Sequence, residues 1–291
     1  MTLSYSFADV APYINWVYFD HAWGMSGKPE AERHQLRHEA EERLQRYGDR
    51  YRTHAVFRLF DCHSEGEDIV LGDTGVRGNE GTRIPCLRQQ QQDSDYLCLA
   101  DFIAPYPAHD SNLVPPHLRT PAPPIESTPS NQIALFATSV DSGMESDFAA
   151  DPYEKMMMQL VADRLAEATA ERLHEQVRKE FWGYACDEQL SMADMLVERF
   201  QGIRPAVGYP SLPDTSLNFV IDQLIDMQQI GIRLTESGAM RPHASVCGLM
   251  FASPKARYFS VGRIGEDQLE DYARRRGLPV VLIRKYLEGN L

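Results

Sequence analysis

Hydrophobic positions along this chain follow helical spacing in some stretches and strand spacing in others. The longest helical pattern begins at Asp151-Pro152, where Asp suits the N-cap and Pro the first helical position. From there to Phe181 apolar side chains recur three to four residues apart for most of the length, which predicts a helix with one face toward a core. Shorter helices are expected at 30–47, 191–200, 217–229, 265–275 and 283–287.

Strand-like runs occupy other parts of the chain. We expect two strands joined by the polar turn 64–67, a buried strand before the long helix, and a strand pair around the turn 252–255. The expected strands are 53–62, 68–71, 83–87, 133–140, 245–251 and 258–261. Helices and strands come in blocks and do not alternate strictly, which predicts an α+β fold with a largely antiparallel twisted sheet flanked by helices.

Prolines gather in one segment, including Pro115-Pro116 and Pro121-Ala122-Pro123-Pro124. Such a composition predicts an extended surface loop, here at about 105–130. We therefore expect residues 1–291 to form a single domain that carries this Pro-rich loop.

Composition narrows the range of partners. The chain is 43% hydrophobic and 24% charged, as is ordinary for a soluble globular protein, and its formal charge is −13. An acidic surface disfavours binding to nucleic acid or to an anionic membrane. The first residues lack a basic and an apolar region, and no apolar stretch reaches the length of a membrane span, so we expect a cytoplasmic protein.

The five cysteines disfavour a metal centre, because they are widely spaced and include no Cys-x-x-Cys pair. We expect reduced thiols, mostly buried, and no metal site.

The stretch from Gly202 to Pro210 holds the strongest candidate chemistry. Arg204 can hold a carboxylate in a two-pronged hydrogen bond. Flanking prolines stiffen the backbone, Gly208 lets a ligand approach it, and Tyr209 offers an aromatic face. This combination suits a small zwitterion with a flat ring system, although an ordinary surface loop can show the same pattern.

This stretch resembles the Arg-x-x-x-Gly-Tyr signature of the activation domain of cobalamin-dependent methionine synthase. Further segments resemble the family in the family's order, so that the resemblance covers nearly the whole chain and the chain looks like a free-standing activation domain. These segments are 13–16, 96–105, 162–168, 174–184, 234–237, 244–248 and 267–275.

The resemblance implies a site for S-adenosylmethionine. Arg204 would bind the ligand carboxylate, and the backbone of Ala206 and Gly208 would contact the adenine edge. Tyr209 would approach the ligand and, in the assembled complex, the cobalt face of cobalamin. Tyr258 matches a family tyrosine near the ligand.

Two further residues enter only through the resemblance. Glu167, which periodicity alone would leave as a solvated charge, would contact the ribose or amino group. Asn15 stands where the family typically has an aspartate that reaches the ligand's ammonium group. Asparagine keeps an acceptor and loses the charge, which should weaken binding by roughly 1–2 kcal/mol, or about tenfold. Val207 replaces a commoner proline and loosens the loop slightly.

The implied function is reductive reactivation. The chain would hold S-adenosylmethionine so that its methyl group reaches cobalamin held by a separate methionine synthase subunit, with a flavodoxin-like protein as electron donor. No catalytic residue is expected, because the sulfonium already carries its leaving group, so the chain would be a component of the methyltransferase and not catalytic alone. The alternative is a module that senses S-adenosylmethionine, or docks on the corrinoid protein, without catalysis. An ordinary methyltransferase ranks last, because no strand-linked Gly-x-Gly-x-Gly stretch occurs.

Overall fold

The computed structural model describes residues 1–72, 81–90, 95–105 and 131–291. The chain forms two compact units, each assembled from three segments. Unit 1 comprises Met1–Arg58, Leu135–Phe200 and Thr215–Leu249, and unit 2 comprises Leu59–Ala134, Gln201–Asp214 and Met250–Leu291. Apart from Pro105, the Pro-rich loop expected at about 105–130 lies outside the described residues.

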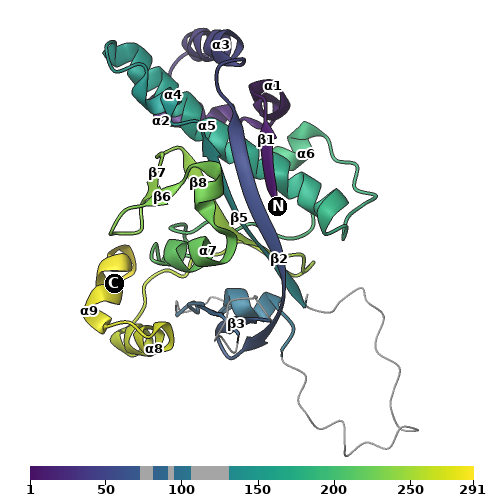
Figure 1. The fold of residues 1–291 in the computed structure, drawn as a ribbon, viewed down its shortest axis with the longest axis vertical. Helices are drawn as coiled ribbons and strands as arrows, with labels where there is room; N and C mark the ends of the chain where they lie inside the picture. Colours follow the sequence, from purple (N-terminus) through teal and green to yellow (C-terminus); the bar gives the residue numbers. More distant parts are fainter. Residues whose placement is uncertain (73–80, 91–94, 106–130) are drawn as a thin grey trace, which may run out of the picture. The chain divides into compact units, whose positions relative to one another are not determined.

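A sheet with the strand order β4-β3-β2-β5-β8 forms the β part of the fold, and β1 pairs with β2 (Figure 1). The pairs β1–β2, β2–β3 and β3–β4 are antiparallel, and β2 and β5 contribute residues to both units. Runs of strands and runs of helices follow one another along the chain, which confirms the predicted α+β class. The strands are β1 (Thr2–Tyr5), β2 (Thr53–Glu65), β3 (Asp68–Leu71), β4 (Arg83–Pro85), β5 (Gln132–Val140) and β8 (Ser245–Met250), with a small separate hairpin of β6 (Arg233–Leu234) and β7 (Met240–Arg241).

Unit 1 is built around the long helix α5 (Pro152–Gln176). The Asp151 side chain accepts hydrogen bonds from the N–H groups of Tyr153 and Glu154, which confirms the predicted start. The first half of α5 buries one face and its second half is buried on most sides, and the helices α1 to α4 pack against α5 (Figure 1). These and the remaining helices of the unit are α1 (Phe7–Val10), η1 (Ala11–Tyr13), α2 (Trp16–Ala22), α3 (Glu30–Tyr47), α4 (Gly143–Ser146), α6 (Met192–Leu196), α7 (Leu217–Ile225) and η6 (Met227–Ile230).

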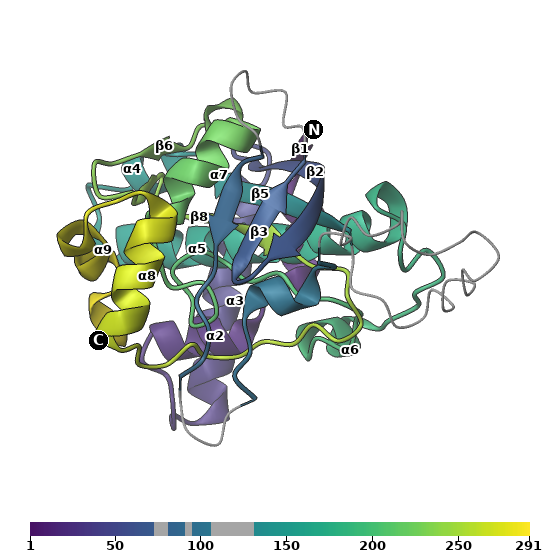
Figure 2. The same cartoon turned by 90° about the horizontal axis from the view of Figure 1, so that it is seen from below.

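Unit 2 holds the β3–β4 hairpin, the 3₁₀ turns η2 (Leu99–Phe102) and η7 (Glu288–Asn290), and two C-terminal helices, α8 (Glu266–Arg276) and α9 (Val280–Tyr286). Helices α8 and α9 lie side by side (Figure 2). Gly277 ends α8 with a left-handed φ of 65°, as the sequence predicts. Around the buried face of α8 the apolar side chains form a core that comprises Leu87, Val261, Ile264, Leu269, Tyr272, Ala273, Ile283 and Leu287.

Several predicted boundaries were wrong, and local backbone geometry explains most of them. α-Helical geometry ends at Gln176 because Val177–Phe181 winds into a π-helical turn. The helix expected at 191–200 stops at Leu196, since Glu198 takes a left-handed φ of 57°. The helix expected at 217–229 stops at Ile225 for the same reason, because φ of Asp226 is 53°. The last helix begins at Val280, earlier than expected.

The strand expected at 258–261 does not form. After β8 the chain makes a turn in which the carbonyl of Ser253 accepts from the N–H of Ala256. The N–H of Val261 donates to Pro210 of a neighbouring loop, so this segment follows the loop and does not extend the sheet.

Four cysteines are buried, Cys186 is exposed, and all five are unbridged thiols. Within the described ranges, the helices are too short or too polar to cross a bilayer.

Candidate functional site

The loop that carries Arg204 is fixed at both ends to one segment of unit 2. Ile203 and Phe251 exchange backbone hydrogen bonds of 3.1 and 2.8 Å. At the other end the N–H of Val261 donates to the carbonyl of Pro210 at 2.9 Å. Because bonds at both ends hold it, the loop between them needs little further ordering to present its side chains.

The chain makes two tight turns between Ala206 and Leu212. The N–H of Tyr209 donates to the carbonyl of Ala206 at 3.2 Å, and Gly208, third in this turn, has a φ of 88°. That positive φ is the mark of a type II turn and favours glycine. The N–H of Gly208 then donates to Leu212 at 2.8 Å, and the N–H of Leu212 donates to Tyr209 at 2.9 Å. The structure thus shows a conformational reason for glycine at 208, while its predicted role in letting a ligand approach the backbone stays a prediction.

Tyr258 contacts the loop directly at Arg204. The backbone N–H of Arg204 donates to the Tyr258 hydroxyl oxygen at 3.0 Å. This contact uses the oxygen of Tyr258 as an acceptor. Tyr258 is 39% exposed and Tyr209 is 51% exposed, which leaves both rings accessible to a ligand. The structure therefore brings Arg204, Ala206, Gly208, Tyr209 and Tyr258 together within unit 2.

Asn15 and Glu167 belong to unit 1. Asn15 is the N-cap of α2, and its Oδ1 accepts from the N–H of Val17 at 3.1 Å. Glu167 lies on α5, partly buried between the buried residues Ala166 and Ala168. The capping role of Asn15 was not predicted, and the ligand contacts of both residues stay predictions.

A buried carboxylate follows the loop directly. Asp214 is 1% exposed, and it accepts from the Tyr272 hydroxyl at 2.8 Å and from Nε of Arg276 at 3.2 Å. Burial, and then the nearby Asp214 charge, raises the pKa of Tyr272 well above its usual value, so the hydroxyl stays protonated and donates. Sequence reasoning missed this cluster, because Asp214 after a proline has the pattern of a turn and its partners lie about sixty residues away.

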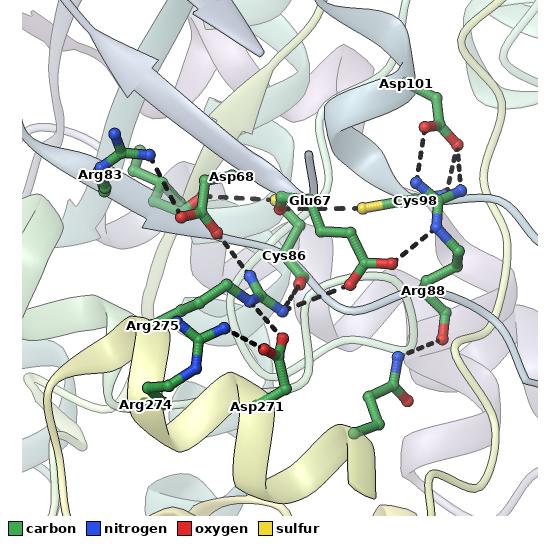
Figure 3. Close-up of polar contacts among 12 residues, drawn as sticks. Glu67, Asp68, Arg83, Cys86, Arg88, Cys98, Asp101, Asp271, Arg274 and Arg275 are labelled. Atoms are coloured by element: carbon green, nitrogen blue, oxygen red, sulfur yellow. Dashed lines mark hydrogen bonds and ion pairs between the residues drawn. The ribbon is translucent and has the colours of Figure 1, made fainter. Parts of the chain in front are cut away.

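Helix α8 makes a second set of polar contacts on the β3–β4 hairpin side (Figure 3). Arg275 donates to Asp68 at 2.5 Å, to the carbonyl of Cys86 at 3.1 Å and to Glu67 at 3.3 Å. Its Nε donates to Asp271, one turn earlier on the same helix, at 2.7 Å. The guanidinium thus joins α8 to both the first strand of the hairpin and the residue that follows the second.

The Arg275 contacts continue through Glu67 to a second arginine. Arg88 donates to Glu67 at 2.8 Å and to both carboxylate oxygens of Asp101 at 2.8 and 2.9 Å (Figure 3). Asp101 also accepts from the N–H of Cys98 at 2.8 Å, which fixes the start of η2. Together these charges tie three separate parts of unit 2 to one another.

In unit 1 the π-helical turn holds a fully buried arginine. Arg178 donates to Glu188 at 2.6 Å from Nη2 and at 3.1 Å from Nε, and its guanidinium lies 4.1 Å from the centre of the Phe200 ring. Glu188 thus pairs the buried charge of Arg178, and loss of this partner would be strongly destabilising.

Comparison with known proteins agrees with this architecture. The family model described as vitamin B12 dependent methionine synthase, activation domain, matches residues 6–277. A solved structure described as the crystal structure of the MetH reactivation domain bound to AdoHcy is 34% identical and has a TM-score of 0.85. The similarity covers 100% of this chain and 90% of that one. The chain therefore belongs to the family of activation domains of vitamin B12-dependent methionine synthase.

Proposed function

We propose that this chain binds S-adenosylmethionine at the Arg204 loop and supports the reductive methylation of cobalamin held by a separate methionine synthase subunit. The observation that carries the proposal is the loop itself, which is bonded at both ends and presents an arginine, a glycine turn and two accessible tyrosines. Rigid presentation of few polar groups is what a small-ligand site requires.

Each group of the loop suits one part of the ligand. The Arg204 guanidinium suits the carboxylate, as a two-pronged charged hydrogen bond. Gly208 has no Cβ, so the adenine can approach the backbone near Ala206 and Gly208. Tyr209 is exposed and offers an apolar ring face, and the Tyr258 hydroxyl lies beside Arg204.

The similar structure with bound AdoHcy supports this ligand class. S-adenosylhomocysteine has the carboxylate, ammonium, ribose and adenine of S-adenosylmethionine and lacks only the transferred methyl group. In unit 1, Glu167 and Asn15 are proposed to contact the ribose or the ammonium group. Asn15 does so without a negative charge, so we expect weaker binding than an aspartate would give.

The proposed reaction requires the chain to position the methyl donor and does not require it to transfer a proton. Cobalamin, bound by the partner, supplies the cobalt, which takes one electron from a flavodoxin-like donor and the methyl group from the sulfonium. The sulfur–methyl bond breaks, and the sulfur keeps the electron pair as a neutral thioether in S-adenosylhomocysteine. Because no proton moves, Arg204 and its neighbours need only bind and orient the methyl donor, an effect that can be large in itself.

Calorimetry with S-adenosylmethionine on the native chain, Arg204→Ala and Arg274→Ala tests the proposal. Arg274 is a suitable control because it belongs to the same unit, carries the same charge and is 73% exposed. We expect micromolar binding that falls by about ten- to a hundredfold in Arg204→Ala, because a charged hydrogen bond contributes roughly 1.5–3 kcal/mol. Equal affinity of the native chain and Arg204→Ala would exclude the loop as the site.

The trans activity needs its own assay. The partner subunit with inactive cobalamin, a reduced flavodoxin and S-adenosylmethionine should regain activity only when this chain is added. Absence of ligand binding together with stable association to the partner would favour the alternative, a docking module without methyl transfer, to which the lost charge at Asn15 points.

A further inference from the structure

Asp214 stands where the Arg204 loop ends, two residues after the turn that closes it. Its carboxylate is almost fully buried and is held by Tyr272 and Arg276 of α8. Movement of this buried carboxylate away from Tyr272 or Arg276 would lose a hydrogen bond in a place where water cannot replace it, which is unfavourable. The end of the loop is therefore fixed by α8 as well as by its own backbone bonds.

Tyr272 is also linked to the loop through the apolar core of unit 2. The Tyr272 ring belongs to the apolar core that includes Val261, and the N–H of Val261 donates to Pro210 in the loop. Phe259, next to the candidate residue Tyr258, packs against this core as well. Tyr272 thus takes part in the hydrogen bond that holds the end of the loop and belongs to the apolar core that includes Val261.

Helix α8 is itself firmly held. Arg275 joins it to the β3–β4 hairpin through Asp68, and Gln268 donates to the carbonyl of Arg88 at 2.8 Å (Figure 3). Gln268 and Arg275 lie on the same face of α8 as Tyr272, and the Arg275 guanidinium lies 5.5 Å from the centre of the Tyr272 ring. The contacts that hold the helix therefore also hold Tyr272 in place.

We propose that Tyr272 and Arg276 are positioning residues for the ligand loop, which act through Asp214. They do not touch the ligand. They increase the fraction of time that the loop spends in its binding-competent arrangement. The inference rests on the proposed function for its ligand, and it adds residues that the Arg-x-x-x-Gly-Tyr signature does not contain.

The proposal has a kinetic consequence that separates positioning from stability alone. When only a fraction of the molecules presents a competent loop, the apparent dissociation constant rises in inverse proportion to that fraction. Loss of the Tyr272 hydroxyl should therefore slow association with S-adenosylmethionine and leave dissociation nearly unchanged, because the bound loop keeps its contacts with the ligand.

Tyr272→Phe in the full chain is the main variant, and Tyr5→Phe is its matched control. Tyr5 is 8% exposed and donates its hydroxyl proton to Gln176 at 2.6 Å in unit 1, so both variants lose one tyrosine hydrogen bond. We expect Tyr272→Phe to weaken S-adenosylmethionine binding about five- to tenfold through slower association, as a hydrogen bond of ordinary strength would give. Tyr5→Phe should stay within about twofold of the native affinity.

Hydrogen exchange without ligand gives a second measurement. The amides of Gly208 and Leu212, which close the turns, should exchange faster than in the native chain in Tyr272→Phe. In Tyr5→Phe they should exchange at the native rate. Arg276→Lys, which keeps the charge and loses the guanidinium geometry, should act in the same direction and serves if Tyr272→Phe does not fold.

The outcomes separate the two proposals. If Arg204→Ala abolishes binding while Tyr272→Phe binds like the native chain, the positioning role is wrong and the site stands. If both tyrosine variants weaken binding equally, the effect is general destabilisation, which also overturns the role. If the native chain does not bind S-adenosylmethionine, the proposed function fails, and the exchange of the two amides alone decides whether α8 positions the loop.

Discussion

Replacement of Arg275 by methionine tests how much the contacts between α8 and the β3–β4 hairpin contribute to the free energy of unfolding. Methionine keeps much of the apolar stem of arginine and removes the guanidinium. Arg275 is 11% exposed, and among the carboxylates it contacts only Asp68, at 7%, is buried to a similar degree. Asp271 and Glu67 are 43% and 28% exposed.

The expected loss of stability depends on the ion-pair partners that each carboxylate retains in Arg275→Met. Asp271 keeps Arg274, and Glu67 keeps Arg88, so these carboxylates stay paired and partly hydrated. Among the described residues, Asp68 keeps an ion pair with Arg83 at 3.5 Å. Since removal of one partner of a buried pair costs about 3–5 kcal/mol, and only one of the three carboxylates is buried, we expect about 3 kcal/mol, the lower end of that range.

Urea unfolding followed by far-UV circular dichroism measures this loss. Tryptophan fluorescence is unsuitable for unit 2, because Trp16, Trp23 and Trp182 all lie in unit 1. With a slope of about 2 kcal/mol per molar urea, the midpoint for unit 2 should fall by about 1.5 M.

The control is Arg274→Met. Arg274 is the other ion-pair partner of Asp271, and its side chain is 73% exposed. This substitution should cost less than about 1 kcal/mol. The double variant Arg275→Met/Asp68→Leu should recover most of the loss, because no buried charge remains unpaired. Equal losses for Arg274→Met and Arg275→Met would refute the reasoning that burial of Asp68 sets the magnitude.

Three further outcomes are expected. Asn15→Asp should bind S-adenosylmethionine about tenfold more tightly at unchanged stability, since either residue caps α2 well; equal affinities by calorimetry would remove the proposed ammonium contact. Val207→Pro should stabilise the type II turn by about 0.5 kcal/mol and raise the affinity slightly, whereas weaker binding would show that the turn is assigned wrongly. Burial alone would raise the pKa of Glu175, but the Tyr13 hydroxyl, Lys179 and Arg172 together lower it. The stability that native Glu175 has over Glu175→Gln should therefore be present at pH 7 and be lost as the pH falls below about 4.3; a difference in urea midpoint that stays constant to pH 3 would contradict this.

The regular elements could be predicted because their signals are local. The Asp151-Pro152 start, the strand periodicity before Cys62 and the glycine after α8 each act within a few residues. The early ends of α6 and α7 could not be predicted, because left-handed φ values at Glu198 and Asp226 have no sequence signal of the kind that glycine gives.

The candidate site likewise has features that the sequence could predict and features that it could not. The turn at Gly208 follows from the identity of a few adjacent residues, and so it was predictable. That Tyr258 contacts Arg204 follows from the path of a segment expected to be a strand, and no pattern near Asp214 points to Tyr272. Contacts between residues far apart in sequence depend on how the elements pack, which periodicity does not record.

The distance along the chain between Asp68 and Arg275 has a consequence for how the protein is made. These two residues are 207 positions apart. At about 5–20 residues per second, a ribosome needs roughly 10 to 40 s to reach the arginine after the aspartate has been added. During synthesis the β3–β4 hairpin must therefore exist without α8, with Arg83 and Arg88 as the nearby partners of Asp68 and Glu67 before Arg275 is made. Unit 2 can complete its folding only late in translation, so conditions that slow elongation should prolong the exposure of its apolar strands to chaperones and proteases.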